Sequence, residues 1–214
     1  MRGVQRKILP MPMPAKPYSG RVQSVFDLTP RDLILNQISG AAYIGAIAIE
    51  WSRIEALLSF LFGLLLFRSA EAKDAIGMAV AVESFELARS FGIKRNLLLA
   101  ATKKRVGSKT RKEFSDLLHD LAEARTSRDE VVHGRWSFTE AKPYKLVRLP
   151  RMASDEKPLL YEPEDLLEIL EKLQEQEIRL LTFFNQKVSP SLKSTLELFG
   201  ELITRKKGDD TKQA

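Results

Sequence analysis

The sequence predicts an all-α fold of about five to six helices, with a small β-hairpin inserted after the fourth helix. Apolar residues recur at helical spacing, and Thr, Ser and Pro residues stand where helices would begin. A hydrophobic content of 44% in 214 residues can bury one sizeable core. We expect one helical domain over residues 29–204, preceded by an extended or disordered arm at 1–28 and followed by a disordered tail at 205–214.

The first predicted helix covers residues 30–67. Thr29 and Pro30 supply an N-cap and a proline at the first helical position. Its second half, 56–67, is apolar on almost every side. We expect this segment to lie in the centre of the core, in a subunit interface, or in both. It is twelve residues long, whereas a membrane span takes about 20, so no transmembrane helix is expected.

The remaining elements follow from capping and breaking residues. The further predicted helices cover about residues 70–88, 93–105, 111–133, 163–188 and 190–204. Thr110 and Glu113 have the spacing of a capping box at the start of the fourth helix. Two strand-like runs, 135–138 and 145–149, predict the hairpin, and residues 150–160 are expected to form a polar loop.

Composition limits the chemistry that the chain can perform. It contains no Cys, which excludes disulfides and thiolate zinc sites, and only two histidines, His119 and His133. We expect no cofactor and no histidine-rich metal site, although carboxylates alone could hold Mg²⁺. A reducing cytoplasm suits this composition. The net charge of +6 is compatible with an anionic partner. His119 lies beside an apolar stripe and is interpreted as structural.

The candidate site is the stretch 128–134, at the end of the fourth predicted helix. Arg128 can hold a phosphate through its forked donors, and His133 can exchange a proton near neutral pH. Asp129 precedes His133 by four residues and could hold the imidazole tautomer. On a straight helix Arg128 and His133 project about 140° apart. They converge only if the last turn unwinds, if Arg128 wraps around, or if a second subunit supplies the missing partner.

Each of these side chains also has a structural interpretation. Glu55 falls within the apolar stripe of the first helix, so we expect it to form an ion pair with Arg125 or Arg128. His133 can serve as a cationic cap of the helix C-terminus, with Gly134 ending the helix. The structural and functional roles are compatible if Glu55 orients an Arg whose other face meets a phosphate.

A basic run precedes the motif helix, with six basic residues within ten positions. They are Lys103, Lys104, Arg105, Lys109, Arg111 and Lys112. Such a run is usually a solvated connection between helices. It can also bind the backbone of an RNA strand.

Three patterns together resemble a known family. Arg128, Asp129 and His133 fit the Arg, polar residue, then His motif of the HEPN superfamily. The pattern Trp-x-x-Ile-Glu-x-x-Leu at 51–58 and the pattern Val-Val-His-Gly-x-Trp at 131–136 are similar to bacterial HEPN-like proteins. The resemblance covers about residues 30–188, mostly as helix order.

The resemblance implies an all-α HEPN-like bundle that forms a homodimer with the motifs meeting at the interface. It also implies metal-independent RNA cleavage, often in toxins or antiviral defence, so RNA and an antitoxin or defence protein are the expected partners. Arg128 and His133 match the family's catalytic pair. The polar position between them is most often Asn in the family, and here it is Asp129.

Two functions remain after these observations. In an endoribonuclease, His133 would act as general base or acid at the ribose 2′-hydroxyl, Arg128 would stabilise charge on the phosphate and Asp129 would orient His133. The alternative is a non-catalytic HEPN-like dimerisation module or a nucleotide- or RNA-binding module.

Overall fold

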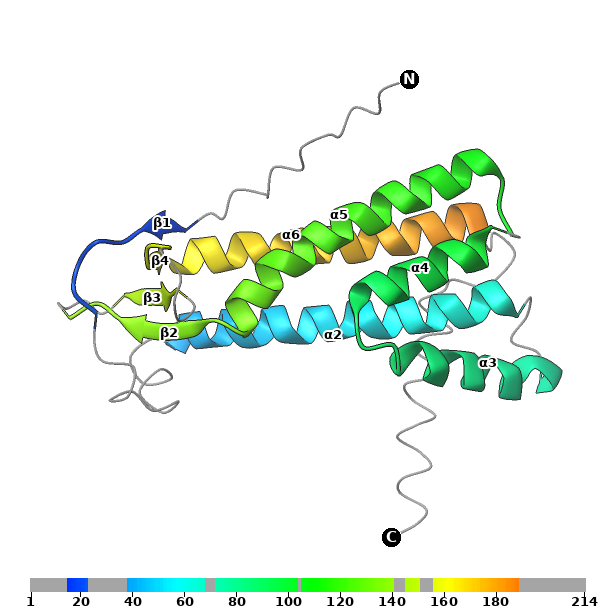
Figure 1. Ribbon diagram of the computed structural model, residues 1–214, viewed down its shortest axis with the longest axis horizontal. Coiled ribbons are helices and arrows are strands. Elements are labelled where there is room, and N and C mark those ends of the chain that lie inside the picture. The colour runs from blue at the N-terminus through cyan, green and yellow to red at the C-terminus, as the bar shows by residue number, and fades with distance from the viewer. Residues whose placement is uncertain are drawn as a thin grey trace, which may run out of the picture. The chain divides into compact units, whose positions relative to one another are not determined.

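The computed structural model describes residues 15–22, 38–67, 72–103, 105–140, 145–150 and 156–188. These residues are mostly helical and include a small antiparallel sheet, so the helical class predicted from the sequence is confirmed (Figure 1). Contacts divide the chain into two units. The first unit is Met1–Glu50 with Glu123–Leu173, and the second unit is Trp51–Ala122 with Gln174–Ala214.

Six helical elements lie in the described residues, and three of them contribute residues to both units. The three shared helices are α2 (Ile38–Leu66), α5 (Ser108–Val132) and α6 (Pro163–Phe183). The second unit adds α3 (Ala72–Glu86), α4 (Phe91–Thr102) and the π-helix η2 (Phe184–Val188).

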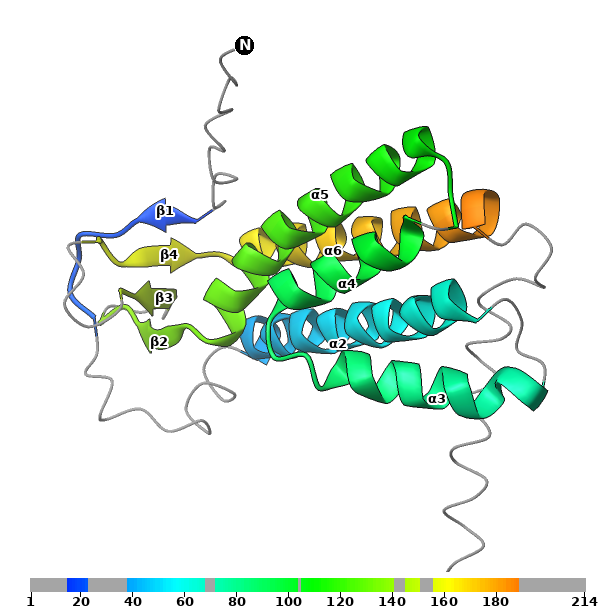
Figure 2. The same cartoon turned by 45° about the vertical axis from the view of Figure 1, so that its right-hand side comes forward.

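The core of the second unit forms around the apolar half of α2, beside which α3 and α4 lie (Figure 1 and Figure 2). Every residue from 57 to 65 is buried in this single chain. A core position for the apolar segment is therefore confirmed, and these residues are not left exposed for a subunit interface. Phe62 stacks on Phe85 of α3, and Phe114 of α5 stacks on Phe183 of α6, each with ring centroids 5.0 Å apart.

Helix boundaries in the second unit differ from the predicted ones by a few residues. The Ser90 hydroxyl accepts a hydrogen bond from the Ile93 amide at 3.2 Å, so α4 begins two residues before its predicted start. Helix α5 begins at Ser108, so Thr110 lies inside the helix and the predicted capping box is wrong. The Thr29–Pro30 cap, the predicted helix at 190–204 and the tail at 205–214 lie outside the described residues.

The first unit contains a four-stranded antiparallel sheet in the order β1-β4-β3-β2. Its strands are β1 (Lys16–Pro17), β2 (Arg135–Phe138), β3 (Leu146–Leu149) and β4 (Leu159–Tyr161). Strands β2 and β3 pair from Arg135 opposite Leu149 to Phe138 opposite Leu146, which confirms the predicted hairpin.

Two further strands were not among the predicted elements, and β4 corrects the sequence analysis. Strand β4 lies where a polar loop was expected, because the apolar run 159–161 pairs with β3. Lys16 and Pro17, in the predicted extended or disordered arm, pair with β4 at the sheet edge, where a proline is tolerated (Figure 2). Beyond β1 the same segment continues to Val22, which forms a bridge with Thr139.

Apolar residues from the sheet and from α6 form the core of the first unit. Phe138, Val147 and Tyr161 are at most 1% exposed, and Leu166 of α6 is fully buried. The indole of Trp136 meets the Tyr161 ring edge-on, with centroids 5.1 Å apart. None of the described helices is long and apolar enough to cross a membrane.

Candidate functional site

The candidate site forms in the first unit where α5 ends and β2 begins. The His133 amide donates to Asp129 O at 3.1 Å, and the Gly134 amide donates to Val131 O at 3.4 Å, which closes the last turn. The Trp136 indole Nε1 also donates to Val131 O, at 3.0 Å. These bonds fix the direction in which the chain leaves the helix, and His133 lies directly after the last helical residue.

Gly134 is required by a close approach of the backbone. A Cβ atom at this position would lie 2.6 Å from Glu130 O, 3.2 Å from Trp136 Nε1 and 3.3 Å from Arg148 Cδ. The first of these contacts is far inside van der Waals range and involves a backbone atom. A larger residue would therefore force the turn from α5 into β2 to shift.

Arg128 and His133 converge within one chain. Arg128 Nη1 lies 3.5 Å from His133 Nε2, at the outer limit of a hydrogen bond. A guanidinium has no lone pair, so Nε2 can only act as acceptor in this contact. The Arg128 side chain is 15% exposed, whereas His133 is an exposed residue. The two side chains meet despite the separation expected on a straight helix, because His133 lies beyond the helix end and the long Arg128 side chain reaches it.

Asp129 contacts two arginines. Its Oδ1 lies 2.6 Å from Arg128 Nη1, and its Oδ2 lies 3.1 Å from Arg125 Nη2. Its connection to His133 is through the backbone, where Asp129 O accepts from the His133 amide. The predicted role of orienting the imidazole is therefore corrected: the carboxylate holds the guanidinium groups of Arg128 and Arg125 instead.

Glu55 has a different partner from the one predicted. Its Oε1 lies 3.3 Å from Nζ of Lys94, within the second unit, and the Lys94 side chain is 11% exposed. The predicted ion pair of Glu55 with Arg125 or Arg128 is corrected to this Lys94 pair. The buried carboxylate that α2 places in the first unit is Glu50, which is 4% exposed and which sequence analysis missed. Both acids lie on the same helix, and their spacing alone does not indicate which one is buried.

The basic run belongs to the second unit and is only partly available. Lys103 and Lys109 are exposed, whereas Arg105 donates to Leu66 O at 2.6 Å and Lys112 forms an ion pair with Asp116 at 2.8 Å. Arg111 is half-buried and Lys104 lies outside the described residues. An RNA-binding role for this run stays a prediction.

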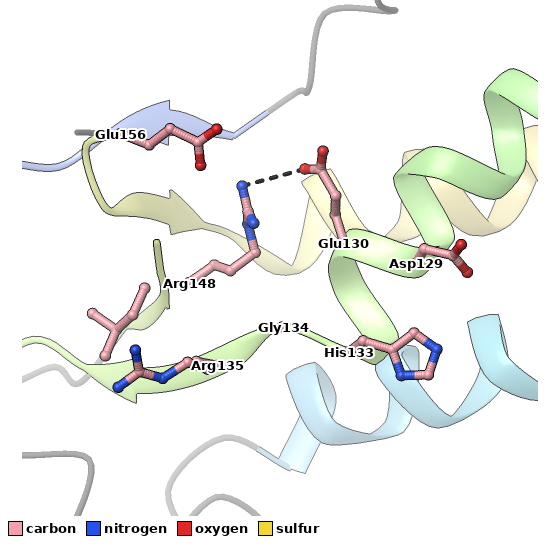
Figure 3. Close-up of a pocket in the computed structure, with 8 residues that line it drawn as sticks. Asp129, Glu130, His133, Gly134, Arg135, Arg148 and Glu156 are labelled. Atoms are coloured by element: carbon pink, nitrogen blue, oxygen red, sulfur yellow. Dashed lines mark ion pairs between the residues drawn. The ribbon is translucent and has the colours of Figure 1, made fainter. Parts of the chain in front are cut away.

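A pocket of about 280 Å³ opens beside His133 (Figure 3). Asp129, Glu130 and His133 of the predicted stretch line it, together with residues that the sequence did not point to: Arg135, Arg148, Leu149 and Glu156. Arg148 Nη2 and Glu130 Oε2 form an ion pair at 3.2 Å, and the Arg148 side chain is 12% exposed. Arg148 Nε is buried and has no hydrogen-bond partner among the described residues.

The buried Tyr161 is influenced electrostatically by both members of this charged pair. Burial raises the pKa of its hydroxyl to about 12; the positive charge of Arg148 partly opposes this shift, and the Glu130 carboxylate adds to it. The hydroxyl oxygen is buried and lacks a hydrogen-bond partner within the described part of the chain. Tyr161 therefore stays protonated over the physiological range and is unsuited to proton transfer near neutral pH.

The chemistry available at the site is that of guanidinium, imidazole and carboxylate groups. Among the described residues, no three His, Asp or Glu side chains are grouped so that they could hold a metal ion. A scan against protein-family models, a search of curated proteins and a search of solved structures found no match for this chain. Function is therefore inferred from the geometry of the site.

Proposed function

We propose that the protein is a metal-independent endoribonuclease of the HEPN type. The observation that carries this proposal is the approach of Arg128 Nη1 to His133 Nε2 at 3.5 Å, beside an open pocket. A phosphate bound by the Arg128 guanidinium would lie next to an imidazole that can exchange a proton. The Arg–polar–His spacing and the glycine that follows it are the same features that resemble the HEPN superfamily.

The reaction is transfer of a phosphodiester within one RNA strand. His133 accepts the proton of a ribose 2′-hydroxyl while the 2′-oxygen forms a bond to the adjacent phosphorus. The bond from phosphorus to the 5′-oxygen breaks, and that oxygen takes up a proton. The products are a 2′,3′-cyclic phosphate and a 5′-hydroxyl end, without an oxidant, a reductant or a metal ion. DNA has no 2′-hydroxyl and should resist cleavage.

Arg128 would stabilise the charge that develops on the phosphate oxygens. Its side chain is 15% exposed and its Nη1 is held by Asp129, so the guanidinium is positioned before substrate arrives. Arg125, on the other carboxylate oxygen of Asp129, keeps that carboxylate in place. The site is thus a positioned cation next to an exposed His133.

A second subunit would complete the proton transfers. One imidazole cannot accept a proton from the 2′-oxygen and donate one to the 5′-oxygen at the same moment, and the described part of α5 offers no second histidine at the site. A homodimer that brings two copies of His133 together would supply both groups. Light scattering across a dilution series measures the oligomeric state; a monomer at micromolar concentration would contradict the composite site.

A second candidate function is a non-catalytic module that binds RNA or a nucleotide. The observation that favours it is the 2.6 Å contact between Asp129 Oδ1 and Arg128 Nη1, because this carboxylate competes with a substrate phosphate for the same donor. Such a module would bind RNA and leave it intact. An antitoxin or defence protein would then be a partner in assembly.

The test compares purified wild type, His133→Ala and His119→Gln on single-stranded RNA in EDTA. His119 is the other histidine of the chain and lies on the same helix, so its variant is the matched control. We expect His133→Ala to lose about 10²–10⁴-fold in cleavage rate, the usual span for an acid–base group, and His119→Gln to keep wild-type activity. Equal cleavage by wild type and folded His133→Ala would reject the mechanism. Binding without cleavage by every variant would support the non-catalytic module.

A further inference from the structure

The pocket beside His133 has a lining of mixed charge. Arg135 and Arg148 supply guanidinium donors, while Asp129, Glu130 and Glu156 supply carboxylate acceptors. Three carboxylates around one small pocket disfavour a free phosphate or another small anion. A neutral ligand that carries both hydrogen-bond donors and acceptors fits this lining better.

The size of the pocket points to one heterocyclic ring system. Its volume of about 280 Å³ lies just under the usual range for small-molecule sites, which begins near ~300 Å³. The lining residues come from the end of α5, from Gly134 and from the sheet, and Figure 3 shows the labelled side chains around this space. A nucleobase is neutral, has donors and acceptors on its edges, and is of suitable size.

The ion pair between Arg148 and Glu130 holds these two side chains next to each other on the wall of the pocket. Glu130 Oε2 is bonded to Arg148 Nη2 at 3.2 Å, which leaves its Oε1 as an acceptor. Arg148 lines the pocket and its side chain is 12% exposed, so it can contribute a guanidinium donor to a ligand there. Figure 3 shows the Arg148 guanidinium pointing toward Glu130, with Gly134 and His133 on the chain below them.

We propose that this pocket binds the nucleobase next to the scissile phosphate and selects guanine; this inference rests on the proposed ribonuclease function. Guanine presents two acceptors, O6 and N7, which match arginine donors such as those of Arg135 and Arg148. Its N1–H and N2–H₂ groups match a carboxylate such as Glu130. Adenine lacks the N1 donor and the O6 acceptor, and each pyrimidine offers one donor group on that edge. A single-stranded RNA exposes these edges for recognition.

The experiment maps cleavage positions on an RNA of mixed sequence with wild type, Glu130→Gln and Glu164→Gln. Glu164 lies in the first turn of α6 and is exposed, so its variant makes the same chemical change outside the pocket. We expect wild type and Glu164→Gln to cut next to guanine, and Glu130→Gln to lose that preference by about tenfold or more. Arg135→Gln serves as a second variant if loss of the Arg148 partner unfolds Glu130→Gln.

A binding measurement separates this inference from the proposed function. Titration of wild type with guanosine 3′-monophosphate and adenosine 3′-monophosphate, followed by isothermal calorimetry, should show tighter binding of the guanine nucleotide. If wild type cleaves no RNA but binds the guanine nucleotide through Glu130, the ribonuclease proposal fails and the guanine site stands. Cleavage without base preference overturns the subsite, and so does equal binding of the two nucleotides. Binding of the guanine nucleotide together with RNA cleavage that shows no base preference would also overturn the subsite, since the pocket would then bind a free nucleotide and not the substrate base.

Discussion

The two ends of helix α5 use the same kind of ion pair in different surroundings. In the second unit Lys112 pairs with Asp116 four residues later, and the two side chains are 79% and 64% exposed. In the first unit Arg125 pairs with Asp129 at the same spacing, but these side chains are 38% and 28% exposed. Asp129 also holds Arg128, which is 15% exposed. Charge at the start of the helix is solvated, whereas charge at its end is gathered and partly desolvated.

This difference bears on the proposed site at the end of α5. Exposed pairs of this kind contribute only about 0–1 kcal/mol and affect mainly solubility. Partly buried charged groups cost desolvation energy that a well-packed apolar core would avoid. The first unit nevertheless places Arg148 and Glu130 on the wall of one pocket that His133 also lines, which favours a role in binding or chemistry over a role in stability.

High pH should destabilise the first unit by ionising the buried hydroxyl of Tyr161. The folded-state pKa of about 12 exceeds the ordinary value of 10.0, so the folded protein holds this proton more tightly than the unfolded chain does. The corresponding stability is fully present below pH 10 and is lost as the pH rises through 12, by about 2–3 kcal/mol in total.

Denaturant unfolding of wild type and Tyr161→Phe from pH 9 to pH 12 measures this contribution, because the difference between the two proteins isolates one hydroxyl. At neutral pH we expect the two proteins to be nearly equally stable, since this buried hydroxyl lacks a partner among the described residues. A constant difference across the whole pH range would show that Tyr161 is solvated in solution.

Adding one methyl group at either end of α5 should sharpen the comparison. Gly134→Ala should lower the free energy of unfolding by about 1–3 kcal/mol, because its Cβ would meet Glu130 O at 2.6 Å. Gly107→Ala is the matched control at the start of the helix, where no atom lies within 4 Å of the added Cβ. We expect its effect to stay within about 0.5 kcal/mol. Equal melting temperatures for the two variants would mean that the α5–β2 turn can move aside.

Removing the ion pair of Glu55 with Lys94 tests whether charged groups of the second unit contribute to stability but not to RNA cleavage. Glu55→Ala leaves Lys94, 11% exposed, without its carboxylate. Because Glu55 itself is 38% exposed, we expect a loss of about 1–2 kcal/mol rather than the larger cost of a fully buried pair. Asp116→Ala, which breaks the exposed pair with Lys112, should cost about 0.5 kcal/mol or less. Both variants should cleave RNA at the wild-type rate below their melting temperatures, and reduced cleavage by folded Glu55→Ala would reject the separation of roles.

Local signals were enough to predict the end of α5 and the hairpin after it. Gly134 and the strand-like runs at 135–138 and 145–149 depend on near neighbours in the chain. They place Arg128 and His133 at a helix end, although the 3.5 Å approach depends on the path of one long side chain.

The remaining features depend on pairing between distant segments. Arg148 reaches the pocket because it lies opposite Trp136 in the sheet, and this register cannot be derived from either strand alone. The place of Glu55 in an apolar stripe predicts a cationic partner but does not identify the helix that supplies it; that helix is α4, which carries Lys94. Strand β1 has two residues, too few for a periodic signal.

The smallest expected effect concerns Asp129, the residue that departs from the Asn most common in the HEPN motif. Its carboxylate binds Arg128 at 2.6 Å and Arg125 at 3.1 Å, so it both positions Arg128 and competes with phosphate for it. Asp129→Asn keeps the size of the side chain, removes the charge and should raise kcat/KM up to about tenfold, equivalent to about 1.4 kcal/mol. Asp116→Asn makes the same change at the solvated end of α5 and should leave kcat/KM unchanged. Steady-state cleavage of one RNA in EDTA measures both variants. A fall in kcat with Asp129→Asn would show instead that the carboxylate is needed to position Arg128. The partly buried charge of Asp129 would then increase activity by positioning Arg128, rather than reduce it by competing with the substrate phosphate.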